Sequence, residues 1–168
     1  MSPSQTASTS SQHNQVIRIF EITRNTCAAL GFYFAYRYYF QQEYLAALHS
    51  LIMLLVIPLA GLTGLESILF SDATAKAKDW AIGSPYQIQS GLNNLAIAIT
   101  AIMILFFKWD QYAELSILCV TLIFFSLSAI NHAISFFKQP HKKIIHLMRL
   151  IFSSLMVAAA LPIILKII

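Results

Sequence analysis

The sequence predicts an all-α integral membrane protein, in which a bundle of four transmembrane helices follows a further helix near the amino terminus. Composition is the first indication, because 58% of the residues are hydrophobic and only 11% are charged, whereas a soluble domain has about 25% charged residues. The second is a series of long apolar blocks. They cover residues 45–70, 87–107, 115–137 and 144–168. Each holds about 20 residues or more, enough for an α-helix to cross about 30 Å of hydrocarbon.

These four blocks should be helices rather than strands, because backbone groups in lipid must form their hydrogen bonds within the segment. The first block carries Pro58, which should kink its helix. Gly61 and Gly64 follow it, and residues without side chains allow a second helix to approach closely. We therefore expect one four-helix transmembrane bundle over residues 45–168.

The segment before this bundle has two parts. Residues 1–15 are rich in Ser, Thr and Gln and predict a disordered tail. Residues 16–41 mix apolar and aromatic residues with Arg18, Arg24 and Arg37, and the stretch between the last two is too short to span a bilayer. This pattern favours an amphipathic helix lying in the membrane interface. A fifth span, with the arginines reaching toward headgroups, stays open.

Basic residues in the connections predict the orientation. Lysines cluster in the third connection and recur in the first, so the positive-inside rule puts both connections in the cytoplasm. Four spans would then leave the arginines of residues 16–41 on the opposite side. Five spans would return the amino terminus to the cytoplasm and remove this conflict, although hydropathy alone favours four.

Polar residues within apolar spans mark candidate sites, because burying them in lipid is costly. Six of them form the candidate polar pocket of this chain: Glu66, Gln87, Asn94, Asn131, His132 and Arg149. In an up-and-down bundle all six approach the same membrane face, about 5 to 11 Å below it at 1.5 Å per residue. We expect Gln87 and Asn94 to point inward, on a face of their helix that is lined with small residues.

Each candidate also has a purely structural interpretation. Ser84, Pro85 and Gln87 are typical of a helix start, as N-cap, first residue and third residue of a capping box. Asn94 and Asn131 are suited to hydrogen bonds between helices. Glu66 has Arg149 or the lipid headgroups as expected partners. His132 has no second histidine at helical spacing, so no metal site is predicted.

The stretch around the start of the second span resembles a known signature. Trp80, Gly83-Ser84-Pro85-Tyr86-Gln87, Gly91 and Asn94-Leu95 are similar to the motif of an uncharacterised family of small four-span bacterial inner-membrane proteins. The resemblance extends from about Gly61 to His132. Gln89 replaces an acidic residue of the family pattern, and Gln139–Lys143 replaces a Pro-Gly-Asn turn. The resemblance implies the topology and the polar cluster but no reaction, and a DoxX-like four-helix bundle is an analogy of architecture only.

Motifs for catalysis are missing from the sequence: there is no Ser-His-Asp set, no pair of carboxylates within the spans and no phosphate-binding loop. Cys27 and Cys119 form no CxxC motif, and the formal charge of +4 is too scattered to indicate nucleic acid. We therefore predict no catalytic residues and no cofactor, and the sequence favours a protein without enzyme activity while leaving that question open.

Three hypotheses remain for the function. The first is a structural, assembly or interaction subunit with a protein partner or a second copy, whose polar residues join helices. The second is a binding protein or small carrier for a lipid, a quinone or a small solute. The third is a quinone-linked redox enzyme subunit.

Overall fold

The computed structural model describes residues 3–72, 75, 85–138 and 145–168, and these residues are helical with no strand among them. The elements are α1 (Pro3–Phe40), α2 (Tyr44–Leu51), the π-helical segment η1 (Ile52–Val56), α3 (Ile57–Leu69), α5 (Pro85–Phe106), α6 (Gln111–Lys138) and α7 (Ile145–Ile164). Four stretches are long and apolar enough to cross a membrane: Tyr44–Leu69, Pro85–Phe106, Gln111–Ile134 and Leu147–Ile164. The predicted all-helical fold, with four apolar spans and a further helix at the amino terminus, is confirmed.

The first span is continuous from α2 through η1 to α3, and its irregular turn precedes Pro58. Proline lacks a backbone N–H and crowds the carbonyl one turn earlier, so a regular helix cannot pass through it unchanged. Here the N–H of Ile57 bonds to the carbonyl of Ile52, five residues back, which is the π-helical pattern. A π turn over Ile52–Val56 thus precedes Pro58, and the kink expected there stays a prediction.

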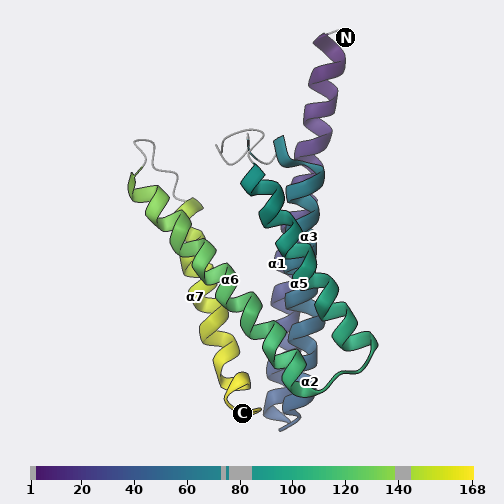
Figure 1. Cartoon of the computed structure of the whole chain (residues 1–168), viewed down its shortest axis with the longest axis vertical. Coiled ribbons are helices and arrows are strands. Elements are labelled where there is room, and N and C mark those ends of the chain that lie inside the picture. The colour runs from purple at the N-terminus through teal and green to yellow at the C-terminus, as the bar shows by residue number, and fades with distance from the viewer. Residues whose placement is uncertain (1–2, 73–74, 76–84, 139–144) are drawn as a thin grey trace.

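Helix α1 reverses into α2 through a tight turn at Gln41–Glu43, where Gln42 has a positive φ of 64°. Because of this reversal, α1 lies lengthwise against the first span (Figure 1). Near one end, the rings of Phe20 and Phe70 meet edge to face at 6.2 Å. Near the middle, the backbone of Gly31 lies so close to Leu54 that an added Cβ would be 3.2 Å from its Cβ.

This lengthwise packing favours the fifth-span alternative over a helix lying in the interface, because α1 follows the first span along most of its length. Residues 3–15 belong to the start of α1. The disordered tail over residues 1–15, and the division of the chain into 1–15, 16–41 and 45–168, stay predictions.

The helices form two groups (Figure 1). Helices α1, α3 and α5 lie side by side, and α6 and α7 pair with each other. The groups meet where α2 begins and α7 ends, which we call the core end. Its fully buried apolar side chains include Leu48, Leu51, Ile52, Leu55, Leu118 and Ile163. The helices diverge toward the other end, where α3 and α6 end and α5 and α7 begin, which we call the polar end.

Candidate functional site

A buried ion pair joins α1 to α3 near the polar end. The Glu66 side chain is 1% exposed, and its Oε2 accepts a hydrogen bond from Nη1 of Arg24 at 2.8 Å. The same nitrogen donates to Thr63 Oγ1 at 3.1 Å. Sequence reasoning named Arg149 or the headgroups for Glu66 and missed Arg24. This partner comes from the segment that hydropathy had placed in the membrane interface.

The sequence did contain a signal for Arg24, in the register of α1. Residues that are buried or partly buried recur at intervals of three and four along this helix, and they form its inward face: Ile17, Glu21, Arg24, Ala28, Gly31 and Ala35. Small residues at the last three positions let α1 approach the first span closely. Since Glu21 and Arg24 continue the same face, they had to point inward as well.

A second polar contact joins α6 to α7. Nη1 of Arg149 lies 2.7 Å from His132 Nε2. A guanidinium has only donors, so Nε2 must be the acceptor and the neutral ring carries its proton on Nδ1. Further along the same pair of helices, the hydroxyls of Ser126 and Ser153 lie 3.0 Å apart.

These two contacts lie near enough for their charges to interact, since Arg149 is attracted by Glu66 and Glu21 and repelled by Arg24. We call Glu21, Arg24, Glu66, His132 and Arg149 the polar layer. It contains three of the six predicted pocket residues. Glu66 bonds directly to Arg24, and the pairing of Glu66 with Arg149 expected from the sequence stays a prediction.

Helix α5 contributes its two inward polar residues separately, and both are buried as expected. Gln87 Nε2 donates to the backbone carbonyl of Ser71 at 2.9 Å. Asn94 Nδ2 donates to the carbonyl of Ser90 in its own helix at 2.8 Å, and its Oδ1 is buried without a hydrogen-bond partner. The predicted cap stays untested: Pro85 begins α5, whereas Ser84 lies outside the described residues.

Asn131 differs from the other five predicted residues, because it is exposed on α6 beside His132. The geometry therefore groups Glu66, His132 and Arg149 with Arg24, leaves Gln87 and Asn94 on the side of α3 that faces α5, and sets Asn131 apart.

Helices α3 and α5 approach each other through glycines. A Cβ added to Gly64 would lie 2.7 Å from Leu95 Cγ and 2.9 Å from the carbonyl oxygen of Gly91. One added to Gly91 would lie 2.9 Å from Ser67 Cβ. At Gly61 the nearest atom would be Ala98 Cβ, at an ordinary 3.5 Å. The close approach expected at Gly64 is present, and Gly61 has room to spare.

The chemistry available to the polar layer is hydrogen bonding and charge pairing. No group of three or more His, Cys, Asp or Glu residues that could hold a metal ion occurs in the described part of the chain. Cys27 and Cys119 are both free thiols. Its two direct contacts both join helices: Arg24 with Glu66 between α1 and α3, and Arg149 with His132 between α6 and α7.

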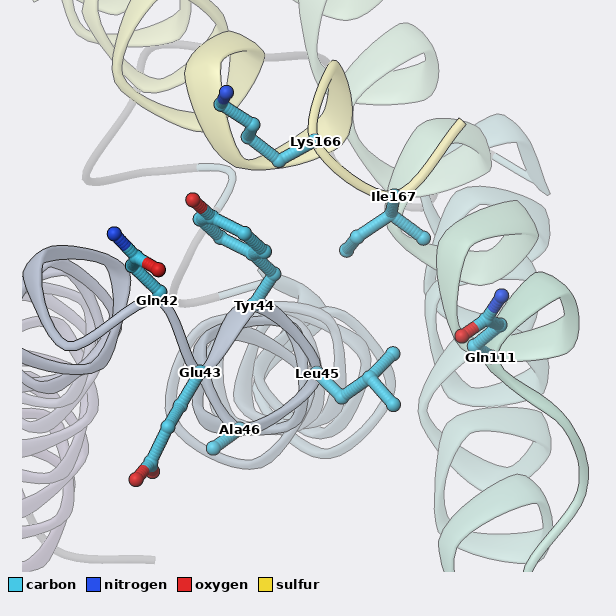
Figure 2. A pocket seen from close by; sticks show the side chains of 8 residues that line it. All are labelled: Gln42, Glu43, Tyr44, Leu45, Ala46, Gln111, Lys166 and Ile167. Atoms are coloured by element: carbon cyan, nitrogen blue, oxygen red, sulfur yellow. The ribbon is translucent and has the colours of Figure 1, made fainter.

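Two open surface hollows lie at the core end. One, of about 530 Å³, lies around Tyr44, with Lys166 and Gln111 on its rim (Figure 2). The other, of about 570 Å³, lies between α1, α2 and α6 and includes Trp109 and Glu114. Neither is lined by a residue of the polar layer, and the predicted polar pocket stays a prediction.

Comparison with known proteins gives a family but no function. No curated protein and no solved structure matches this chain. One family model does match, and it includes α1 from Arg18 onward as well as the four apolar spans. The chain belongs to the family of unknown function DUF6790, whose model matches residues 18–167.

Proposed function

We propose that this protein is a structural or interaction subunit of a bacterial inner membrane, in which the polar layer joins the spans and the apolar outer surface meets a partner protein or a second copy. One observation carries the proposal: the buried charged groups of the layer are bonded to each other across helices. The bacterial location rests on the signature around Gly83–Gln87.

The ion pair explains how α1 can stay in the bilayer. This helix contains three arginines, and a charged side chain in hydrocarbon costs several kcal/mol unless it is paired. Arg24 meets Glu66 directly, at 2.8 Å. Arg18 and Arg37 lie toward the ends of the segment, where long side chains reach the headgroups. Pairing at the centre and snorkelling at the ends together support five spans.

Five spans also satisfy the charge rule for orientation. They bring the amino terminus, the first connection and the third connection to the polar end. Basic residues of this end are the more numerous: Arg18, Lys76, Lys78, Lys138, Lys142 and Lys143, against Arg37, Lys108 and Lys166 at the core end. The positive-inside rule then puts the polar end in the cytoplasm.

Reporter fusions test this topology. A reporter active only in the cytoplasm should work at the amino terminus and fail at the carboxyl terminus, and an export-dependent reporter should behave in the opposite way. Equal behaviour at both termini would mean an even number of spans and would remove α1 from the bilayer.

The subunit role itself is tested by the assembly state. Native mass spectrometry of protein extracted in polymer-bounded bilayer discs should detect a partner chain or a second copy at fixed stoichiometry. The variant Arg24→Met/Glu66→Met, which removes the charges and keeps the side-chain volume, should retain that assembly. A wild-type protein that is always monomeric and without partners would contradict the proposal.

A small carrier is the second candidate, and the unpartnered Oδ1 of Asn94 favours it. If solute binds there, Asn94→Ala should abolish a ligand-dependent thermal shift and leave the folded fraction nearly unchanged. In the subunit role the same change should alter stability alone. The quinone-linked alternative depends on His132, whose Nε2 already accepts a bond from Arg149.

A further inference from the structure

The larger hollow combines features that the polar layer does not use. It lies at the core end, where α6 begins, and its volume is about 570 Å³. Two aromatic side chains, Tyr38 and Trp109, line it together with the contact between His49 and Glu114. Its remaining lining is largely apolar and includes Leu45, Leu48 and Met53.

The charge of this hollow is negative. Glu114 is the carboxylate in its lining, and that side chain is 14% exposed. Within the described residues its partner is His49, whose Nδ1 lies 3.3 Å from Oε1. No lysine or arginine is among the residues that line the hollow. The contact with His49 fixes the position of the Glu114 carboxylate at the wall of the hollow.

A carboxylate beside aromatic rings is suited to an alkylammonium ion. The faces of Trp and Tyr rings attract cations, and quaternary ammonium groups are commonly held in this way. From this juxtaposition of Glu114, Trp109 and Tyr38, we propose that the hollow binds the ammonium group of a zwitterionic phospholipid with an ethanolamine or choline headgroup.

The surroundings favour a lipid over a soluble amine. Leu45 and Met53 are among the apolar side chains exposed on the outside of the first span, so the lining of the hollow continues into the lipid-facing surface. The hollow also lies at the level where the spans end, which is where headgroups lie. A lipid there keeps its acyl chains on apolar surface while its amine reaches Glu114.

The adjoining hollow supplies a cation for the phosphate. It shares Leu45, Ala46 and Gln111 with the larger one, and Lys166 is on its rim. Figure 2 shows Tyr44 between Gln42 and Lys166, and the Lys166 Nζ lies 5.8 Å from the centre of the Tyr44 ring. Glu43 also lines this hollow, but its side chain points away from Lys166 (Figure 2). Glu114 and Lys166 thus lie in adjoining hollows, and their charges match the two charges of a zwitterionic headgroup.

Lipid competition tests this assignment. Protein in detergent is mixed with equal amounts of phosphatidylethanolamine, phosphatidylcholine and phosphatidylglycerol, and the retained lipids are measured by native mass spectrometry. The two zwitterionic lipids should be retained above phosphatidylglycerol. Glu114→Gln should reduce their retention about tenfold, because it removes a charge-assisted contact. Asp72→Asn, a matched loss of one carboxylate beyond α3, should leave it unchanged.

Three results would overturn the proposal. One is equal retention in Glu114→Gln and Asp72→Asn, and another is preferential retention of phosphatidylglycerol by the wild type. The third is a thermal shift with free choline chloride as large as that with the lipid, which would assign the site to a soluble amine.

Two further variants keep the test valid if Glu114→Gln does not fold. Trp109 is half exposed, so Trp109→Leu tests the ring without disturbing the contact between His49 and Glu114. It should lower retention of both zwitterionic lipids several-fold. Lys166→Gln should lower it as well, whereas Arg37→Gln, the loss of another exposed cation toward the same end, should not. Unchanged retention in Trp109→Leu and Lys166→Gln would contradict the site.

Discussion

Helix α3 packs against its two neighbours in opposite ways. Toward α1 it presents Glu66 and Thr63, and the contact is a buried ion pair with Arg24. Toward α5 it presents Gly64, and the contact is backbone against backbone at Gly91. One face depends on charge and the other on the lack of a side chain. Helices in one small bundle can thus associate through quite different forces. Different substitutions are therefore expected to disrupt each interface.

The charged interface should give the largest effect. Arg24→Met leaves the carboxylate of Glu66 buried without its closest cation, and breaking a buried pair from one side costs about 3–5 kcal/mol of stability. Unfolding by sodium dodecyl sulfate in mixed micelles, followed by circular dichroism, measures this cost.

The second half of that experiment is the rescue. Adding Glu66→Met to Arg24→Met removes the stranded charge, so most of the lost stability should return, since apolar replacements of buried ion pairs are often neutral. If the double variant is no more stable than Arg24→Met alone, the pair does not explain the packing of α1 on α3.

The glycine interface should give the next largest effect. Gly64→Ala forces a methyl group to within 3 Å of both Leu95 and the Gly91 carbonyl, and overpacking of this kind costs about 1–3 kcal/mol. Gly61→Ala is its matched control, because the new methyl group meets its nearest neighbour at 3.5 Å and alanine favours helix formation. The same micelle titration should show Gly61→Ala equal to or slightly above the wild type. Equal losses in both variants would mean that α3 and α5 are not in close backbone contact.

The contact between α6 and α7 tests whether a neutral polar pair behaves like the ion pair. His132→Ala removes the acceptor for Arg149 and should lower stability by about 0.6–2 kcal/mol, the usual range for polar contacts between transmembrane helices. Asn131→Ala, at the exposed neighbouring position, should cost less. A larger cost for Asn131→Ala would reverse the assignment of the inward side of α6.

The smallest effect is expected at Asn94. Its amide nitrogen bonds within its own helix, and its Oδ1 has no partner, so Asn94→Ala removes a buried acceptor along with some packing. We expect a loss of less than about 1 kcal/mol. A loss larger than that of His132→Ala would indicate that Asn94 makes a strong contact within the folded protein, as the subunit role would require.

The same comparison shows what can be predicted from a single sequence. The glycine contact could be predicted because Gly61, Gly64 and Gly91 are local signals, and helical spacing shows which side of α5 carries the small residues. The four apolar spans follow from hydropathy in the same way. Residue spacing within a single segment was therefore enough to predict these features.

The ion pair could not be found in that way, because Arg24 and Glu66 are 42 residues apart and each is unfavourable in its own segment. Hydropathy counts a charge as a cost and has no means of recognising its partner. The candidate pocket itself stays a prediction. Two of its members, His132 and Arg149, are in direct contact, whereas Glu66 bonds to Arg24.

The π turn over Ile52–Val56 has a consequence for everything that follows it in the first span. A turn that contains one extra residue rotates the rest of the helix by about 100° relative to an uninterrupted one. Without that offset, the side of α3 that carries Glu66 would face away from Arg24, even though no residue in either helix had changed. Deleting one residue from this turn would let it close as a regular α-helical turn with Glu66 still facing Arg24, whereas deleting one residue from the regular helix after Pro58 would turn Glu66 away from Arg24.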